Sequence, residues 1–273
     1  MRPLLQSGLH SARRIYGLVY RHVALYRRSW PRLLEISYWP TLELLIWGFT
    51  ASYFSHATLN PGLLAGGALI AGVLLWEVTL RGQLGVTYSF LEDIWSRNLG
   101  HVFVSPLRPA ELVASLLVVS LLRTLVGLFP ATILAYLLYS FNILHLGPVL
   151  LLFFANLLVM GWWVALLIVA LLFRYGAGAE ALAWTVAFGI TPFACVFYPV
   201  AVLPTWLQPL ALALPAAHIF EGMRAALLHN ITDWRNLAAA AALNTAWLLV
   251  AIAVFGLQFR AARIRGALIS IGE

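Results

Sequence analysis

Long apolar runs separated by short polar connections set the pattern of hydrophobic and polar positions in this chain. Six runs cover most of the sequence, at about residues 38–56, 62–82, 112–140, 147–173, 181–202 and 236–259. Most of them hold about 20 residues or more, and a helix of that length crosses a hydrocarbon core of about 30 Å at about 1.5 Å per residue. The pattern predicts an all-α membrane protein with six transmembrane helices.

Positive charge alternates with these runs along the chain. Most arginines outside the runs lie in the N-terminal segment, in the second and fourth connections and in the C-terminal tail: Arg2, Arg13, Arg14, Arg21, Arg27, Arg28, Arg32, Arg97, Arg108, Arg174, Arg260, Arg263 and Arg265. The connections at about 55–60 and 140–145 hold no formal charge. Because arginine-rich loops remain on the cytoplasmic side of a membrane, we expect both termini to be cytoplasmic.

The composition is that of one membrane domain. Hydrophobic residues make up 62% of the chain and charged residues 10%, against about 25% charged in an average soluble domain. We therefore divide the chain into an N-terminal segment at 1–37 and a single six-span domain at 38–273. The net charge of +7 comes largely from arginines that flank the spans, so membrane orientation explains it better than nucleic-acid binding.

The N-terminal segment contains the pattern of an amphipathic helix at about 10–30. At about 100° per residue, the apolar side chains share one arc and the arginines the opposite one: Ile15, Leu18, Val19, Leu25 and Tyr26 against Arg13, Arg14, Arg21, Arg27 and Arg28. Such a helix lies in the membrane plane with its guanidinium groups facing phosphates and water, either as an anchor alone or with a further role. Pro31 and Pro40 are expected to mark the turn into the first span.

Four charged residues fall inside predicted spans: Glu43, Glu77, Arg81 and Arg123. An embedded charge is costly unless it is paired or hydrated. Glu77 and Arg81 are four residues apart in the order that favours an ion pair on one helix face. Snorkelling toward the headgroups is the alternative for Glu43 and Arg81. Arg123 lies deeper, and we expect it to pair with Glu77 or Glu43.

The longest polar interruption, at about 88–111, lies on the predicted cytoplasmic side between the second and third spans. It mixes charged and apolar side chains: Glu92, Asp93, Arg97 and Arg108 with Leu91, Ile94, Trp95 and Leu99. This mixture is typical of a short helix that docks on a soluble partner, and we expect that helix at about 92–107. Its candidate contact residues are Glu92, Leu99, Val102 and Pro106.

The fifth run is interrupted by prolines, unlike the others. Five prolines follow one another within about 24 residues: Pro192, Pro199, Pro204, Pro209 and Pro215. A straight helix cannot persist through them, and irregular backbone at membrane depth requires protein or a water-filled cavity to satisfy it. We expect the span to end near Tyr198 and to be followed by short re-entrant helices in an extracellular segment at about 199–235.

Several chemistries are excluded by what the chain lacks. There is no lysine, so neither a Walker A phosphate loop nor a Schiff base can form. Cys195 is the one cysteine, which we expect to be a small buried hydrophobic residue. The seven histidines are scattered without metal-ligand spacing, so we expect no catalytic or metal site and no enzyme. A secondary transporter is the main alternative to the function considered next, although such proteins favour interrupted helices in both halves.

Two blocks of sequence carry a family resemblance. The first, after the second span, reads N-L-G-H-V-F-V-S-P-L-R-P-A-E, and the second, after the fifth, reads F-Y-P-V-A-V-L-P-T-W-L-Q-P-L-A-L-A-L-P-A-A-H-I-F-E-G-M-R. In the second block, a proline-tryptophan-leucine run is followed by a later proline and an arginine: Pro204, Trp206, Leu207, Pro215 and Arg224. With the amphipathic N-terminal helix and six spans, these blocks resemble the type-two ABC exporter permeases, which include drug, nodulation-factor and polysaccharide exporters.

The resemblance implies the permease subunit of an ATP-driven exporter in the bacterial cytoplasmic (inner) membrane. Two permease chains, as a homo- or heterodimer, would pair with two separate ATPase subunits that bind ATP and Mg²⁺, while this chain would bind no cofactor. The segment at 88–111 would be the coupling helix.

The same resemblance implies an outer gate in the proline-broken segment, with Tyr198, Pro204, Trp206 and Gln208 as its candidate residues. The first, second and fifth spans, with the proline-broken segment at 192–215, would line a lateral cavity between two permease chains, and a rigid extracellular cap is the alternative. Short outer loops and many aromatic side chains favour a lipidic, amphiphilic or drug-like substrate.

Overall fold

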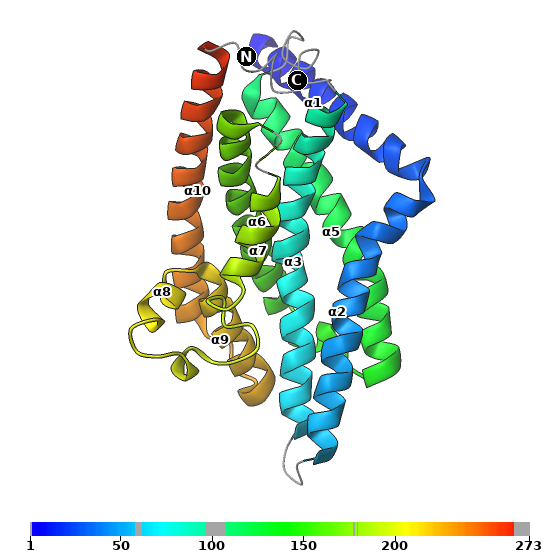
Figure 1. Ribbon diagram of the computed structural model, residues 1–273, viewed down its shortest axis with the longest axis vertical. Helices are drawn as coiled ribbons and strands as arrows, with labels where there is room; N and C mark the ends of the chain where they lie inside the picture. The colour runs from blue at the N-terminus through cyan, green and yellow to red at the C-terminus, as the bar shows by residue number, and fades with distance from the viewer. Residues whose placement is uncertain (1, 58–61, 97–107, 177, 179, 265–273) are drawn as a thin grey trace.

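The computed structural model of the chain describes residues 2–57, 62–96, 108–176, 178 and 180–264. Nearly all of them are helical, and no strand occurs in these ranges. In chain order the elements are α1 (Arg2–Arg27), α2 (Trp30–Ala57), α3 (Gly62–Trp95), α5 (Pro109–Tyr139), η1 (Ile143–Leu146), α6 (Val149–Tyr175), α7 (Ala181–Ile190), η3 (Val200–Val202), α8 (Gln208–Leu212), α9 (Pro215–His229) and α10 (Trp234–Ile264) (Figure 1). The predicted all-α class is confirmed.

Four helices in the described residues are long and apolar enough to cross a membrane: Gly67–Trp95 of α3, α5, α6 and α10. They correspond to the second, third, fourth and sixth predicted spans. The first predicted span lies in α2, which has 28 residues but also contains Arg32, Glu35 and Glu43 and is not among the four. The fifth lies in α7, which has only 10 residues. By length and composition, the chain is a helical membrane protein, with four such helices in the part of it that the structure describes.

The predicted end of the fifth span near Tyr198 is wrong, because α7 already ends at Ile190. Proline lacks the N–H group that continues a helical ladder, and Pro192 follows two residues later. The short helices expected after this point are present as η3, α8 and α9. Together with the irregular backbone that joins them, they gather at one end of the bundle (Figure 1).

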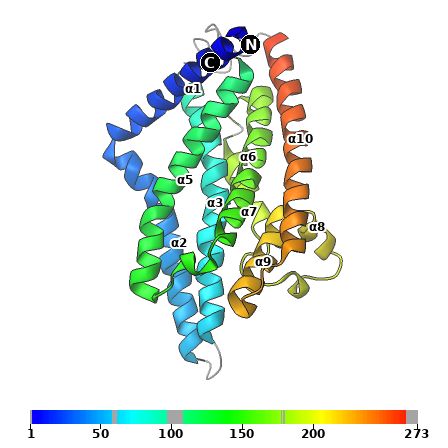
Figure 2. The same cartoon turned by 180° about the vertical axis from the view of Figure 1, so that it is seen from behind.

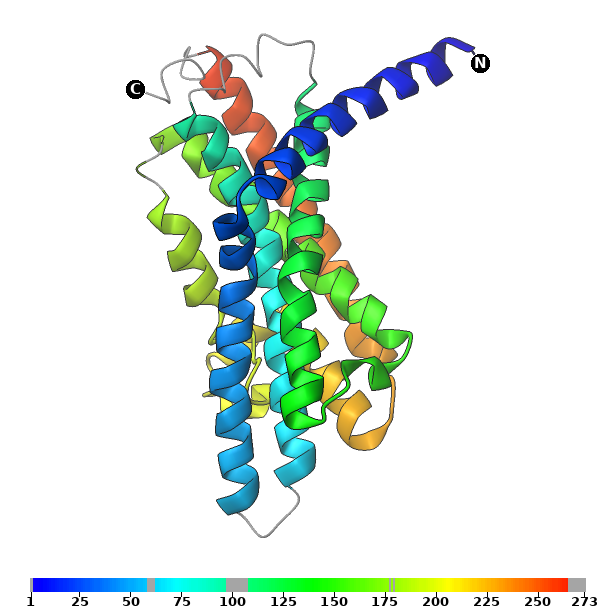
Figure 3. The ribbon, with the colours of Figure 1, turned by 90° about the vertical axis from the view of Figure 1, so that its right-hand side faces the viewer.

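Helix α1 lies across the opposite end of the bundle and projects away from it on its N-terminal side (Figure 3). It ends at Arg27, and after a break at residues 28–29 the chain turns sharply into α2. The predicted amphipathic helix is therefore present, but it begins earlier and ends earlier than expected. Pro31 lies in the first turn of α2, whereas Pro40 lies inside α2 and does not end it, contrary to prediction.

Helix α3 occupies the centre of the bundle, between α2 and α5 on one side and α6 on another. Small residues let these helices approach closely. A Cβ atom on Gly161 of α6 would lie 2.5 Å from the carbonyl oxygen of Thr79, and one on Gly85 would lie 2.9 Å from the Cα atom of Ser120 in α5. Because lipid tails are as apolar as the helices, such close packing and interhelical hydrogen bonds drive association in a membrane. Ser120 supplies one of these bonds, since its Oγ donates to the carbonyl of Gly82 at 2.7 Å.

The two ends of the bundle differ in content, and we name them by their helices. The α1 end holds α1, the last turns of α3 and α10, and the first turn of α5 (Figures 1 and 2). The α9 end holds α8, α9 and the first turn of α10. At about 1.5 Å per residue, the 34 residues of α3 span about 50 Å, which exceeds a hydrocarbon core of about 30 Å. Part of α3 therefore extends beyond such a core.

Candidate functional site

Three acidic residues lie at the α1 end, where α3 stops and α5 starts. Glu92 and Asp93 are in the last turn of α3, and Glu111 is in the first turn of α5, so they flank residues 97–107 on both sides. Asp93 is 2% exposed and Glu111 is 5% exposed. A buried carboxylate is costly unless a cation and hydrogen bonds compensate it, so each of these residues needs a partner.

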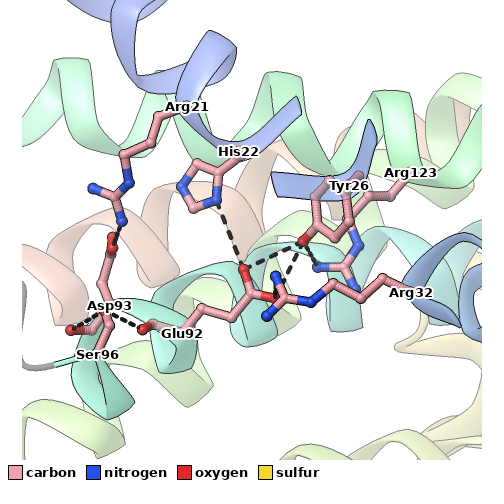
Figure 4. Close-up of polar contacts among 8 residues, drawn as sticks. All are labelled: Arg21, His22, Tyr26, Arg32, Glu92, Asp93, Ser96 and Arg123. Atoms are coloured by element: carbon pink, nitrogen blue, oxygen red, sulfur yellow. Dashed lines mark hydrogen bonds and ion pairs between the residues drawn. The ribbon is translucent and has the colours of Figure 1, made fainter. Parts of the chain in front are cut away.

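Helix α1 supplies two of these partners as arginines. Arg14 binds Glu111 through both sides of its guanidinium fork, with Nη2–Oε1 at 2.6 Å and Nε–Oε2 at 2.9 Å. Two parallel charge-assisted hydrogen bonds of this kind are stronger and more directional than a single one. Arg21, two helical turns further along α1, forms an ion pair with Asp93 (Figure 4).

Glu111 also organises the start of its own helix. Its Oε2 accepts a hydrogen bond from the backbone N–H of Arg108 at 3.0 Å, and its Oε1 accepts one from Ser11 Oγ at 2.6 Å. A carboxylate in the first helical turn is stabilised by the helix dipole. The same side chain therefore starts α5 and holds α1 against it.

Glu92 is the centre of a second group of contacts (Figure 4). His22 Nδ1 lies 3.8 Å from Glu92 Oε2, and Arg32 Nη1 from α2 lies 3.8 Å from Oε1. Tyr26 Oη lies 3.3 Å and 3.4 Å from the two carboxylate oxygens. Helices α1, α2 and α3 thus meet at one carboxylate.

Arg123 of α5 joins this group through Tyr26. Its Nη1 donates to Tyr26 Oη at 2.7 Å, and its guanidinium carbon lies 5.0 Å from the centre of the Tyr26 ring. Burial raises the pKa of the Tyr26 hydroxyl, so this group stays protonated and can accept from Arg123 while it donates to Glu92. We call the nine residues Arg14, Arg21, His22, Tyr26, Arg32, Glu92, Asp93, Glu111 and Arg123 the α1 network.

The predicted pairing of Arg123 with Glu77 or Glu43 is wrong. Within the described residues, no ion pair joins Arg123 to either carboxylate. Arg81 occupies that position instead, since its Nε donates to Glu77 Oε2 at 2.8 Å. The predicted i,i+4 pair of Glu77 and Arg81 is confirmed, and Glu43 of α2 lies beside both. Glu77 is completely buried, and its Oε1 has no hydrogen-bond partner in the described part of the chain.

The predicted coupling residues fall in two groups. Glu92 lies in the last turn of α3, so residues 92–95 extend that helix and do not begin a separate one. Leu99, Val102 and Pro106 lie outside the described residues. Of the apolar stripe expected to face a partner, Leu91 and Ile94 are buried in the core, whereas Trp95 is 50% exposed.

The candidate outer-gate residues lie at the α9 end and are held mainly by local contacts. Tyr198 Oη donates to the carbonyl of Pro192 at 2.6 Å, and Gln208 Nε2 donates to that of Leu203 at 3.0 Å. Pro204 is exposed, and Trp206 is 76% exposed. These side chains line neither the cleft described next nor the groove considered further below.

Side chains of α9 satisfy the irregular backbone before them. Arg224 Nη1 donates to the carbonyl of Cys195 at 3.0 Å, and Glu221 Oε1 accepts from the N–H of Val200 at 2.7 Å. The expectation that protein satisfies this backbone is confirmed at these positions. Cys195 is fully buried as predicted.

A small cleft of about 30 Å³ opens between α2, α3, α5 and α7. Two arginines and three aromatic side chains contribute to its lining: Arg81, Arg123, Trp39, Tyr88 and Trp184. Tyr88 and Trp184 are joined by a hydrogen bond of 2.6 Å. The cleft is lined by residues from the first, second, third and fifth predicted spans, and residues 192–215 do not line it. The lateral cavity between two chains stays a prediction.

Sequence reasoning did not assign Arg14, Arg21, His22, Tyr26 or Asp93 to a site. The available signal was the spacing of seven between the two arginines, which places them on one face of α1. The same spacing is also typical of two arginines on a face that is exposed to water. The acidic partners are 97 and 72 residues away in sequence, so the local sequence of α1 does not reveal them.

Comparison with known proteins adds no relative. No family model matches the chain, and no curated protein matches it. In the described residues, no group of three or more His, Cys, Asp or Glu side chains is arranged to hold a metal ion.

Proposed function

We propose that this chain is the permease subunit of an ATP-driven ABC exporter that moves a lipidic, amphiphilic or drug-like substrate out across the cytoplasmic membrane of a bacterium. Two copies, or this chain and a second permease, form the membrane part, and separate ATPase subunits bind ATP and Mg²⁺. In this proposal α2 and α7 complete a set of six spans, and the α1 end faces the cytoplasm, where arginine-rich segments remain.

One observation carries the proposal: α1 holds both ends of the connection at 97–107. Asp93 before the connection and Glu111 after it are each bound to an arginine of α1. A partner that moved this connection would therefore move α3, α5 and α1 together. Since α1 continues into α2 after two residues, the displacement would reach the first span. This is the arrangement that a coupling segment requires.

A secondary transporter is the second candidate, and the Glu43, Glu77 and Arg81 cluster favours it. Ionisable side chains inside the membrane mark proton and ion pathways in such proteins. The two candidates differ in their energy source, because the first needs a nucleotide and the second needs an ion gradient.

The test begins with purification of the tagged chain from its own host in mild detergent, followed by identification of a co-purifying ATPase and reconstitution of the complex in vesicles. We expect ATP hydrolysis by the complex and nucleotide-dependent substrate movement. Movement driven by a proton gradient without any ATPase would refute the proposal in favour of the second candidate.

A double variant, with a matched control, tests where the permease contacts the ATPase. Replacing Leu99 and Val102 with glutamate should abolish ATPase retention while membrane insertion is normal. The matched control replaces Leu144 and Ile231 with glutamate, because these apolar side chains are exposed away from the α1 end. Equal ATPase retention by both double variants would exclude the 97–107 connection as the docking site.

A further inference from the structure

A second hollow lies beneath the corner between α1 and α2. It is a groove of about 230 Å³ bounded by α1, α2 and α5, and we call it the corner groove. Its apolar lining includes Leu33, Val119, Leu122 and Val126. Leu122 and Val126 are 40% and 46% exposed, so the groove opens on the outer surface of the bundle, where a membrane protein meets lipid.

Two arginines line this otherwise apolar groove. Arg27 is the last residue of α1, and Arg123 comes from α5. Within the described residues, Arg27 has neither an ion pair nor a hydrogen bond through its side chain, and Arg123 donates only to the neutral hydroxyl of Tyr26. That hydroxyl also links Arg123 to the carboxylate of Glu92. Most of the N–H donors of both guanidinium groups therefore remain available.

The groove adjoins the cleft described above. Ile36 and Arg123 line both hollows, so Arg123 stands between an apolar space and a space that is also lined by Arg81 and Glu35.

We propose that the corner groove binds an anionic phospholipid of the membrane leaflet in which α1 lies. One acyl chain lies along Leu33, Leu122 and Val126, and the phosphate receives hydrogen bonds from Arg27 and Arg123. Guanidinium groups match phosphate oxygens in geometry as well as in charge, and basic pockets between membrane helices are suited to anionic headgroups. A zwitterionic lipid adds a cationic group that these two arginines disfavour. The inference needs the membrane location but not the ATPase.

The test measures lipid binding to the full chain by native mass spectrometry in detergent. The probes are phosphatidylglycerol and phosphatidylcholine with identical acyl chains. We expect selective retention of phosphatidylglycerol, and a loss of affinity of about fivefold for Arg27→Gln, since one arginine near a lipid surface contributes about that factor. Arg28→Gln is the matched control, because Arg28 is the adjacent exposed arginine and does not line the groove.

A second variant tests the tail without changing charge. Val126→Trp fills the apolar groove and should reduce phosphatidylglycerol retention. Val118→Trp, at a valine of α5 with similar exposure that does not line the groove, should not. Equal binding of both lipids, or equal losses in Arg27→Gln and Arg28→Gln, would overturn the proposal, since the attraction would then belong to the whole basic surface. Recovery of a non-phospholipid amphiphile in preference to phosphatidylglycerol from native membranes would overturn it too, because the groove would then belong to the exported cargo.

Discussion

At the α1 end of the bundle, charged side chains from distant parts of the sequence neutralise one another, whereas at the α9 end side chains hold the backbone of a nearby segment. Arg14 and Glu111 are 97 residues apart. Arg224 and Cys195 are 29 residues apart, and Glu221 and Val200 are 21 apart. At both ends, polar groups that lie away from water find partners within the protein. Only at the α1 end do charged side chains join separate helices.

The difference has a mechanical consequence. At the α1 end, an ion pair transmits a displacement between helices that share no adjacent sequence. At the α9 end, the contacts stiffen one continuous stretch from Thr191 to His229, which fits either a rigid cap or a gate that moves as a unit. The two ends should therefore respond differently when a single arginine is removed.

The largest effect is expected for Arg21→Gln. Asp93 is 2% exposed, so loss of its cation leaves a carboxylate that is buried and unpaired, which costs about 3 kcal/mol of stability. Asp93→Asn should cost less, because about a third of the Arg21 side chain is exposed and water can solvate it. Thermal unfolding in detergent measures both values.

The control for this prediction exchanges the charges, as Arg21→Asp with Asp93→Arg. Recovery of much of the lost stability by the exchanged pair would identify the ion pair as the cause. If Arg21→Gln unfolds at the same temperature as the original chain, the α1 network does not hold α1 to the bundle, and the contrast between the two ends disappears.

A somewhat smaller effect is expected at the α9 end for Arg224→Gln. The carbonyl of Cys195 would lose its hydrogen bond in a buried setting, at a cost of about 2 kcal/mol. Because Cys195 is the one cysteine of the chain and is fully buried, its rate of reaction with a thiol reagent reports on this segment directly. We expect faster labelling in Arg224→Gln and an unchanged rate in Arg21→Gln. Faster labelling in both variants would show that the two ends are not independent.

The sequence predicts the helical class well, because hydrophobic runs of membrane length have few other solutions. Four of the six predicted spans coincide with helices long and apolar enough to cross a membrane. The ion pair of Glu77 and Arg81 was predictable for a different reason, because two residues four positions apart on a helix are neighbours on one face. The fifth span was misjudged because its apolar composition continues past Ile190, although Pro192 had already removed the helical hydrogen bond.

The candidate site was predicted only in part. The role of Glu92 in coupling stays a prediction. Its partners within the chain were not predicted, because pairing across 66 residues to Tyr26 depends on the angle at which α1 crosses the bundle. The periodicity of apolar and charged residues in α1 carries no information about that angle. The same limit explains the wrong partner for Arg123, which donates its hydrogen bond to Tyr26 of α1 and not to Glu77.

A smaller change at the α1 end is Tyr26→Phe, which separates the hydrogen bonds of this residue from its ring. The variant keeps the ring under the Arg123 guanidinium but removes the hydroxyl that links Arg123 to Glu92. We expect a loss of about 1 kcal/mol. Tyr20→Phe is the control, since the Tyr20 side chain is 60% exposed, and it should unfold at the original temperature. Identical unfolding temperatures for the two variants would exclude Tyr26 as a link in the network.

The smallest effect is a pH dependence at the α9 end, from Asp233 before α10. Its Oδ1 accepts from the N–H groups of Arg235 and Asn236, both at 3.1 Å, which is the geometry of a helix N-cap. The Asn236 N–H, with other hydrogen bonds, lowers the pKa of this carboxyl in the folded state. The stabilisation is therefore complete above the unfolded pKa of about 3.9 and is lost as the pH falls through the lower folded value. Asp233→Ala should cost about 1 kcal/mol at neutral pH and much less at the acid end of that window. A cost that stays constant down to the lowest pH would mean that the charge of Asp233 has no part in holding α10.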